Sequence, residues 1–307
     1  MELLHGLDAM NHLPRGAALS VGNFDGIHLG HQKIIDHLAD AGTSGVVVAT
    51  FEPHPTSVLR PDLAPPRLTS VERKRALLAE AGVTHLVELP ADDSVLKLEA
   101  KAFCEAVRDR AEPAVWAEGH DFRFGRGAIG NVDRLTEWLA ESGVSVEIVE
   151  QATVVLPGLQ VVSASSSLVR WLVVHGRVCD AAAVLGRKYS VSGEVVRGAQ
   201  RGRTIGFPTA NVQVDDHLVP ADGVYAGRCD VDGASHVAAV SIGTNPTFDG
   251  PVRTVEAYLV GFEGDLYGRH LSVTLERWLR GQERYSGVDP LVRQLNVDVE
   301  QAVRLVA

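Results

Sequence analysis

The sequence is poor in the residues that mark secreted, zinc-binding and membrane-spanning proteins. Its 307 residues include only three cysteines, Cys104, Cys179 and Cys229, and no two of them form a C-x-x-C pair. This excludes a disulfide framework and a cysteine zinc site, and it is typical of a reducing compartment. No apolar run approaches the roughly 18 residues that indicate a membrane helix. Residues 1–14 lack the apolar stretch of a signal peptide, so we expect a cytoplasmic protein with no membrane partner.

Positive charge is also scarce. Lysine and arginine number 29 against 39 aspartates and glutamates, a formal net charge of -10. A nucleic-acid-binding surface normally shows a basic stripe, so we expect no nucleic-acid partner. ATP is not excluded, because a few local cations, backbone N–H groups and Mg²⁺ suffice to hold a triphosphate. Hydrophobic residues make up 45% and charged residues 22%, which is ordinary for a chain that folds around packed cores.

Up to about residue 185, strand-like runs alternate with helical patterns. The strand-like runs lie at residues 17–21, 45–51, 84–89, 114–117 and 144–149, and the helical patterns lie at 31–41, 69–82, 95–108 and 131–139. Strands and helices that alternate at this spacing predict a parallel sheet covered by helices. We therefore expect a Rossmann-like α/β domain over residues 1–185.

From residue 189 the pattern changes to short β-branched segments separated by turn residues. These segments lie at 189–197, 224–231, 236–242, 255–262 and 271–279, and they predict a small antiparallel β-barrel. Asp289 and Pro290 then indicate the start of a terminal helix with an apolar face for packing on the barrel. We expect this second domain to span residues 186–307.

The first candidate site lies between the first predicted strand and the first predicted helix. Residues 22–31 contain three glycines, Asp25, His28 and His31. Ligands bind beyond the carboxyl ends of strands in an open parallel sheet, and glycines let the backbone approach a phosphate closely. Imidazole donors suit the charge that builds on phosphate oxygens during displacement. Two histidines, an aspartate and three glycines together favour a phosphate site over a capping or core histidine. A zinc site is disfavoured because no cysteine or third ligand is nearby.

Three other segments leave a functional and a structural interpretation open. The glycine- and arginine-rich residues 197–211 lack the G-K-[S/T] of a Walker loop and either fold over ATP or form a solvated hairpin loop. The serines and arginine of residues 165–170 suit phosphate binding, but serines also cap helices, and both can hold at once. Glu256, in a strand-like run, is either functional or a solvated outer-face residue.

Four motifs in order resemble one family. They are G-N-F-D-G-I-H-L-G-H at 22–31, T-F-E-P-H-P at 50–55, G-H-D-F-R-F-G at 119–125 and S-S-S-L-V-R at 165–170. Together they resemble the adenylyltransferase half of bacterial bifunctional riboflavin kinase/FAD synthetases. The resemblance implies that His28 and His31 stabilise the triphosphate of ATP while the phosphate of FMN attacks its α-phosphorus. It further implies ATP or phosphate contacts from Gly22, Asn23, Phe24, Asp25, Gly30, Ser166, Ser167 and Arg170.

The same resemblance implies FMN contacts near two of these motifs. They involve Phe51, Pro53, His54, Asp121, Phe122 and Phe124, of which Asp121 is assigned to substrate positioning. Aromatic residues that follow strands are as often core residues. The chain departs from the family at Ser167, where a threonine is usual; the hydroxyl is kept.

The C-terminal half carries a second set of motifs. P-T-A-N at 208–211 resembles the riboflavin kinase motif, supported by family-like pieces at 220–225, 241–248, 265–268 and 277–280. The resemblance implies that Thr209 and Asn211 hold Mg²⁺ and that Glu256 accepts the proton of the riboflavin 5′-hydroxyl. It also implies ATP contacts from Gly198, Gly202, Arg203, Gly206, Pro208, Thr209 and Asn211, and flavin contacts from Glu256 and Arg280.

The expected function is therefore bifunctional synthesis of flavin cofactors. ATP phosphorylates riboflavin to FMN at the C-terminal domain, and the N-terminal domain adenylylates FMN to FAD with release of pyrophosphate, with Mg²⁺ as cofactor. The expected partners are the small molecules riboflavin, FMN, FAD and ATP, and a homo-oligomer stays open. The alternatives are an enzyme with one active half and a non-enzymatic flavin-sensing protein.

Overall fold

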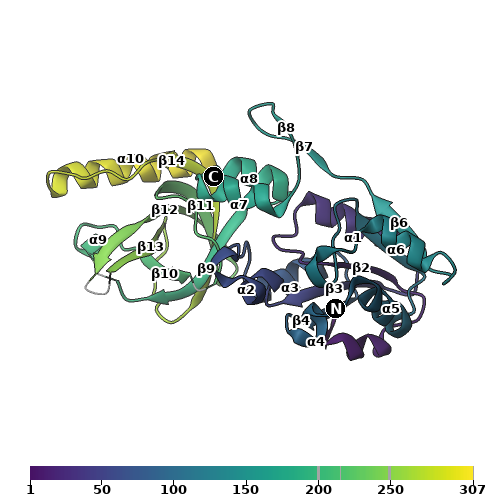
Figure 1. Ribbon diagram of the computed structural model, residues 1–307. Coiled ribbons are helices and arrows are strands. Elements are labelled where there is room, and N and C mark those ends of the chain that lie inside the picture. The colour runs from purple at the N-terminus through teal and green to yellow at the C-terminus, as the bar shows by residue number, and fades with distance from the viewer. Residues whose placement is uncertain (199–200, 215, 248–249, 307) are drawn as a thin grey trace. The chain divides into compact units, whose positions relative to one another are not determined.

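The computed structural model describes residues 1–198, 201–214, 216–247 and 250–306, which form two compact units (Figure 1). The first unit comprises Met1–Pro65 and Val71–Thr153, and the second comprises Pro66–Ser70 and the chain from Val154 onwards. Among the described residues, no helix is both long and apolar enough to span a membrane.

The first unit is built on a six-stranded parallel sheet. Its strands, in spatial order, are β1 (Glu2–His5), β4 (His85–Pro90), β3 (Val46–Glu52), β2 (Ala18–Gly22), β5 (Val115–Gly119) and β6 (Ser145–Val149). The chain winds away from β2 in both directions, through β3 and β4 on one side and β5 and β6 on the other. The centre of the sheet at β2 is therefore its topological switch point, where a ligand is expected.

Helices cover both faces of this sheet. On one face, α5 (Ala100–Ala111), α6 (Val132–Leu139) and the 3-10 helix η1 (Leu7–His12) pack against residues such as Leu19 and Val47. On the other face, α1 (Leu29–Asp40) and α3 (Val71–Glu80) pack against residues such as Ala18 and Val48. Alternate residues of each central strand thus enter opposite cores, which explains the continuous apolar runs in the sequence. The predicted parallel sheet covered by helices is confirmed.

Short elements account for most differences from the predicted strands and helices of this unit. Strand β1 was not predicted, because its residues E-L-L-H form neither an apolar run nor an alternation. The single helix predicted at 95–108 is two helices, α4 (Asp93–Leu96) and α5. The remaining short helices are α2 (Pro55–Leu59), η2 (Pro61–Leu63) and η3 (Arg126–Ala128).

The second unit contains the predicted antiparallel barrel, and this barrel is closed. Its order is β10 (Ala210–Val214), β13 (Gly250–Leu259), β12 (Ala234–Thr247), β11 (Gly223–Val231), β14 (His270–Arg280) and β9 (Tyr189–Val196). Strand β10, five residues long, was not predicted. Outside the barrel lie the hairpin of β7 (Thr153–Val155) and β8 (Val161–Ser163), with α7 (Ser166–Val174), α8 (Val178–Leu185) and the short α9 (Arg201–Thr204).

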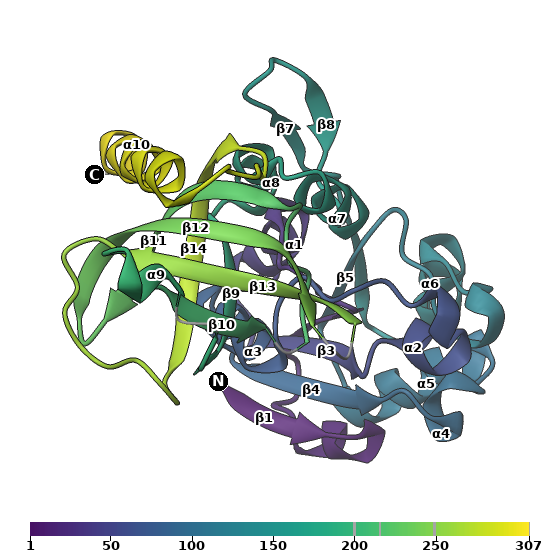
Figure 2. The same cartoon turned by 90° about the vertical axis from the view of Figure 1, so that its left-hand side faces the viewer.

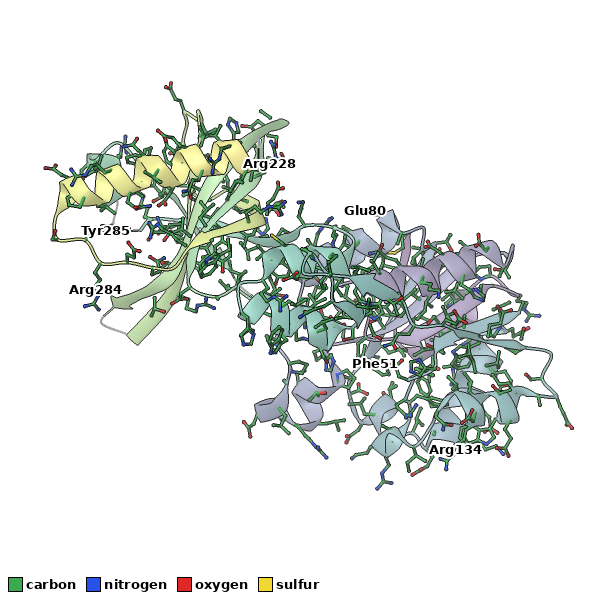
Figure 3. The ribbon with its side chains drawn as sticks, turned by 90° about the horizontal axis from the view of Figure 1, so that it is seen from above. Phe51, Glu80, Arg134, Arg228, Arg284 and Tyr285 are labelled. Carbon is green, nitrogen blue, oxygen red and sulfur yellow. The ribbon has the colours of Figure 1, made fainter. Side chains whose placement is uncertain are left out.

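The terminal helix α10 (Val288–Val306) lies along the barrel, against β11, β12 and β14 (Figure 2). It begins one residue before the predicted cap Asp289, so Pro290 falls in the first turn, where a missing N–H is tolerated. Ala302 and Val306 pack on Ala226 of β11. At the C-terminal end of α10, the guanidinium of Arg228 donates a hydrogen bond to the carbonyl oxygen of Val306 (Figure 3).

Candidate active sites

The first candidate site is the loop between β2 and α1, residues 23–28, which we call the phosphate loop. Phe24, Gly26 and Ile27 have positive φ angles of 45°, 80° and 37°. Such a conformation is strained for residues other than glycine and persists where the surroundings impose it. Here the side chains of Phe24 and Ile27 are 1% and 2% exposed, in the core beneath α1. Phe24 thus anchors the loop with its ring, and a phosphate would meet only its backbone.

His28 is the N-cap of α1. Its Nδ1 accepts hydrogen bonds from the backbone N–H groups of Gly30 at 3.1 Å and His31 at 3.4 Å. Nδ1 therefore carries no proton, which places the ring proton on Nε2 as a donor. The capping alternative is thus confirmed, and it is compatible with a catalytic role. The N–H groups of Gly30 and His31 at the start of α1 are thus bound to His28.

The two motif histidines lie together, as predicted. The rings of His28 and His31 stack with centroids 3.7 Å apart, and His31 also contacts the ring of Phe24 at 4.9 Å. On the other side of β2, Thr50 of β3 donates a hydrogen bond to the carbonyl oxygen of Asn23 at 3.0 Å. Lys74 in turn donates to the Thr50 hydroxyl at 2.7 Å. The phosphate loop thus ends at a histidine stacked on His31 of α1 and has a buried lysine two hydrogen bonds away.

The residues predicted to contact FMN divide between core and surface. Phe124 is 7% exposed, stacks on Phe122 at 5.0 Å and meets Trp138 edge-on at 6.2 Å. Phe51, labelled in Figure 3, and Phe122 are half-buried and pack against the same core.

Three other residues predicted to contact FMN lie in the segments that follow β3 and β5. His54 caps α2 by accepting the N–H of Thr56 at 3.2 Å, Pro53 is exposed, and Asp121 is exposed after β5. The FMN contacts of all six residues stay a prediction.

The serine run caps a helix, as its structural interpretation expected. Ser165 Oγ accepts the N–H of Leu168 at 3.2 Å, so Ser166 and Ser167 form the first turn of α7. Arg170 Nε donates to the carbonyl oxygen of Pro66 at 2.8 Å. These residues belong to the second unit and His28 and His31 to the first, and their contact with the same phosphates stays a prediction.

The second candidate site lies on the outer face of the barrel. Val255 and Ala257 of β13 are buried, so Glu256 between them faces outward, where it is half-buried. Its register partners are Asn211 on β10 and Ser241 on β12. The Thr209 hydroxyl donates to Glu256 Oε2 at 3.4 Å. The fold therefore brings together the three residues predicted for kinase chemistry.

Two glycines of the predicted ATP loop are required by close packing. A Cβ atom at Gly198 would lie 2.5 Å from Asn211 Oδ1, and one at Gly202 would lie 2.2 Å from the carbonyl oxygen of Phe207. Gly206 has a φ of 87°. Arg203 and Pro208 are exposed, and residues 199 and 200 of the predicted loop lie outside the described residues. The ATP contacts of this segment stay a prediction.

Comparison with known proteins identifies both halves. The model of the FAD synthetase family matches residues 10–163, and that of the riboflavin kinase family matches residues 185–306. The bifunctional riboflavin kinase/FMN adenylyltransferase of Escherichia coli K12 is 34% identical over 304 residues, covering 97% of this chain and 96% of that protein. The protein of the same description from Pseudomonas fluorescens is 35% identical over 312 residues, covering 100% and 98%.

The chain belongs to the bifunctional riboflavin kinase/FMN adenylyltransferase family. It is an enzyme with both a riboflavin kinase and an FAD synthetase domain, as the motifs predicted. A solved structure described as a macrolide-efflux protein from Streptococcus pneumoniae covers 100% of both chains at 27% identity, with a TM-score of 0.87. That likeness concerns the fold.

In the riboflavin kinase half, Arg280 joins the barrel to α10. Its Nε and a terminal nitrogen donate to the two carboxylate oxygens of Asp298 at 2.9 and 2.7 Å, and the hydrogen-bonded carboxylate raises the pKa of the guanidinium. Asp298 is 1% exposed and also accepts from Gln294 at 2.9 Å. This bidentate pair gives Arg280 a structural role that sequence reasoning missed; its flavin contact stays a prediction.

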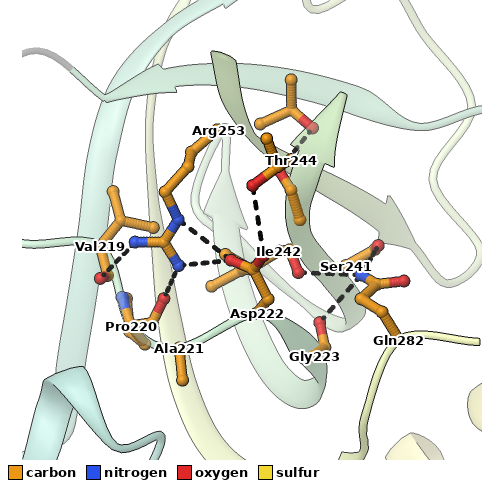
Figure 4. Close-up of polar contacts among 12 residues, drawn as sticks. Val219, Pro220, Ala221, Asp222, Gly223, Ser241, Ile242, Thr244, Arg253 and Gln282 are labelled. Atoms are coloured by element: carbon orange, nitrogen blue, oxygen red, sulfur yellow. Dashed lines mark hydrogen bonds and ion pairs between the residues drawn. The ribbon is translucent and has the colours of Figure 1, made fainter. Parts of the chain in front are cut away.

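The polar contacts around Arg253 and Ser241 were also missed (Figure 4). Arg253 of β13 donates to Asp222 at 2.7 and 3.0 Å and to the carbonyl oxygens of Val219 and Pro220. Gln282 donates to the Ser241 hydroxyl at 2.9 Å. Asp222 lies in residues 220–225, which resemble the family, but its partner Arg253 lies in β13. Nothing in the local sequence indicates this pair.

Proposed function

We propose that this chain converts riboflavin to FMN at the barrel and FMN to FAD at the phosphate loop, each with Mg²⁺ and ATP, and that it acts in the cytoplasm. The kinase assignment rests on the convergence of Thr209, just before β10, and Asn211 of β10 with Glu256 of β13. The stacked His28 and His31 at the switch point of a parallel sheet support the adenylyltransferase assignment.

In the kinase reaction, Glu256 accepts the proton of the riboflavin 5′-hydroxyl as its oxygen attacks the γ-phosphorus of ATP, and ADP leaves. The Thr209 hydroxyl orients this carboxylate through its hydrogen bond to Oε2. The donor set also fits Mg²⁺, because a hydroxyl and an amide carbonyl are hard oxygen ligands. Thr209 and Asn211 would hold the ion, which neutralises phosphate charge when bound.

In the adenylyl transfer, an oxygen of the FMN phosphate attacks the α-phosphorus of ATP and pyrophosphate leaves. No side-chain nucleophile is required, so catalysis consists of positioning and charge stabilisation. His28 donates from Nε2 to the phosphate oxygens because its Nδ1 is bound to the helix backbone. From the motif resemblance, phosphate contacts are also proposed for Ser166, Ser167 and Arg170.

The functional boundary is proposed between Leu185 and Gly186. The FAD synthetase match ends at residue 163 and the riboflavin kinase match begins at residue 185, which supports a boundary at that point. The compact unit that contains the barrel also contains α7 and α8. The proposed boundary therefore assigns these two helices to the adenylyltransferase domain, although they pack in the same unit as the barrel.

The test is a flavin product assay with purified protein, riboflavin and Mg·ATP, resolved by chromatography. We expect FMN to appear first and FAD to follow. Accumulation of FMN alone would refute the adenylyltransferase assignment, and FAD formed only from supplied FMN would refute the kinase assignment. Flavin binding without either product would indicate the non-enzymatic alternative.

A further inference from the structure

The sheet opens beside the phosphate loop. Strands β2 and β5 pair only at Ala18 with Val115 and at Leu19 with Trp116, whereas β2 and β3 stay paired as far as Gly22 and Thr50. Beyond Leu19, the β5 side of β2 therefore lacks a neighbouring backbone. Backbone N–H groups buried without a partner are costly, so something else must bind those of β2 at this opening.

Glu118 of β5 provides this partner. Its Oε1 accepts the backbone N–H of Val21 at 2.7 Å and the indole N–H of Trp116 at 2.8 Å, and its Oε2 lies 3.2 Å from the Ser20 hydroxyl. The residue is 3% exposed. A side chain thus replaces the strand ladder one residue before Gly22, where the chain leaves the sheet for the phosphate loop.

We infer that Glu118 is a positioning residue for adenylyl transfer: by binding Val21 and Ser20 it sets the path of the phosphate loop that carries His28. Thr50 binds the Asn23 carbonyl oxygen from the β3 side, so neighbouring side chains hold the loop's entry on both sides of β2. This inference rests on the proposed adenylyltransferase function of the first unit.

The carboxyl suits a site that receives a triphosphate. Burial raises the pKa of Glu118 to about 8. The three hydrogen-bond donors lower this pKa and the nearby Asp121 raises it slightly, but burial has the largest effect. In its protonated form the group keeps all contacts, because Oε1 still accepts two hydrogen bonds and a proton on Oε2 faces the Ser20 hydroxyl. Glu118 thus supports the loop at neutral pH without adding a full negative charge near the phosphates.

The test compares Glu118→Gln with Glu118→Met, two unbranched side chains of nearly equal length. Glutamine keeps an acceptor for Val21 and Trp116, and methionine removes it. We expect kcat/KM for ATP in FAD synthesis from supplied FMN to fall about tenfold or more in Glu118→Met, consistent with one lost well-placed contact. We expect Glu118→Gln to stay within about threefold of the wild type. Riboflavin kinase activity of the same chains is the internal control and should not change.

An unchanged kcat/KM in Glu118→Met would overturn the inference, as would an equal loss in both variants. A parallel fall of kinase activity would reveal general unfolding and would also count against a positioning role. Should Glu118→Met not fold, Glu118→Asp, which is one methylene too short to reach Val21, must show the same selective loss. Wild-type protein that makes no FAD would instead refute the proposed function itself.

Discussion

Asn211 on β10 and Glu256 on β13 are register partners on the outer face of the barrel. Thr209, two residues before Asn211, donates to the Glu256 carboxylate. This arrangement places oxygen ligands for a metal beside a proton acceptor, although Asn211 and Thr209 lie 45 and 47 positions before Glu256 in the sequence. The kinase assignment can therefore be tested one residue at a time.

Replacement of Glu256 by alanine should abolish FMN formation. General-base catalysis contributes about 10² to 10⁴ in rate, so we expect a loss of that size. FAD synthesis from supplied FMN should persist, because Glu256 takes no part in that reaction. Product chromatography with either flavin as substrate measures both. Loss of both activities in a folded variant would contradict the two-site assignment.

Removal of the Thr209 hydroxyl should weaken the kinase and its metal dependence. In Thr209→Ala we expect kcat/KM to fall about tenfold or more and half-maximal activity to need more Mg²⁺, because a ligand to a charged group is lost. Thr209→Ser keeps the hydroxyl and should remain close to the wild type. A chelator should stop the reaction in all three proteins, and Mg²⁺ should restore it. Equal losses in the serine and alanine variants would count against a ligand role.

His28 should have two separable contributions. His28→Ala should lower FAD synthesis by about 10² to 10³, the usual loss for one transition-state donor, and destabilise α1 by about 1 kcal/mol through the lost cap. His28→Asn restores a capping side chain without a donor at the position of Nε2. We therefore expect normal stability and low activity in the asparagine variant, measured by urea unfolding and product assay. Recovery of activity with asparagine would reduce His28 to a cap.

The buried Arg280–Asp298 pair should stabilise the barrel unit. Asp298→Ala leaves a partly buried guanidinium without its carboxylate, which typically costs about 3 to 5 kcal/mol. The loss should lower the urea midpoint at which kinase activity disappears. The midpoint for FAD synthesis from FMN should fall with it, because Ser166, Ser167 and Arg170 belong to the same unit. An unchanged kinase midpoint would contradict a stabilising role of the pair.

Glu118 should make the stability of the first unit depend on pH. Its pKa is raised from 4.5 to about 8 in the folded protein, so the folded state binds the proton more tightly than the unfolded state. The stabilisation is fully present below pH 4.5 and is lost as the pH rises towards 8, by up to about 1.4 kcal/mol per pH unit. The glutamine of Glu118→Gln does not ionise in this range. The difference in free energy of unfolding between this variant and the wild type should therefore shift in favour of the variant as the pH rises, and then level off. Parallel curves in urea unfolding would contradict the shifted pKa.

The sequence predicted those features that depend on local periodicity or on a motif. The apolar run at 45–51 and the face of the helix at 31–41 define the α/β unit, and the alternation around Glu256 places its side chain away from the barrel core. Strands β1 and β10 were not predicted: E-L-L-H in β1 does not alternate, and the alternating A-N-V-Q-V of β10 begins inside residues 197–211, which were interpreted as a loop. Their placement depends on neighbouring strands that are distant in sequence.

The contacts that organise the sites were harder to predict because they join different elements. Glu118 stands within an apolar strand pattern and Lys74 within a helical one, and nothing local marks either as buried. The position of Glu118 makes sense only once β2 and β5 are known to separate. Similarly, the cap formed by His28 through Nδ1 fixes which nitrogen holds the proton, and no sequence pattern reports a tautomer.

Glu256 lies on a strand with hydrogen-bonded neighbours on both sides, inside a closed barrel. The conformational entropy of its backbone is therefore lost when the barrel folds and not when riboflavin binds. Its amide hydrogen should exchange with solvent no faster than the barrel opens, even in protein without nucleotide. Ligand binding then has to order the substrates around an acceptor whose main chain is already fixed.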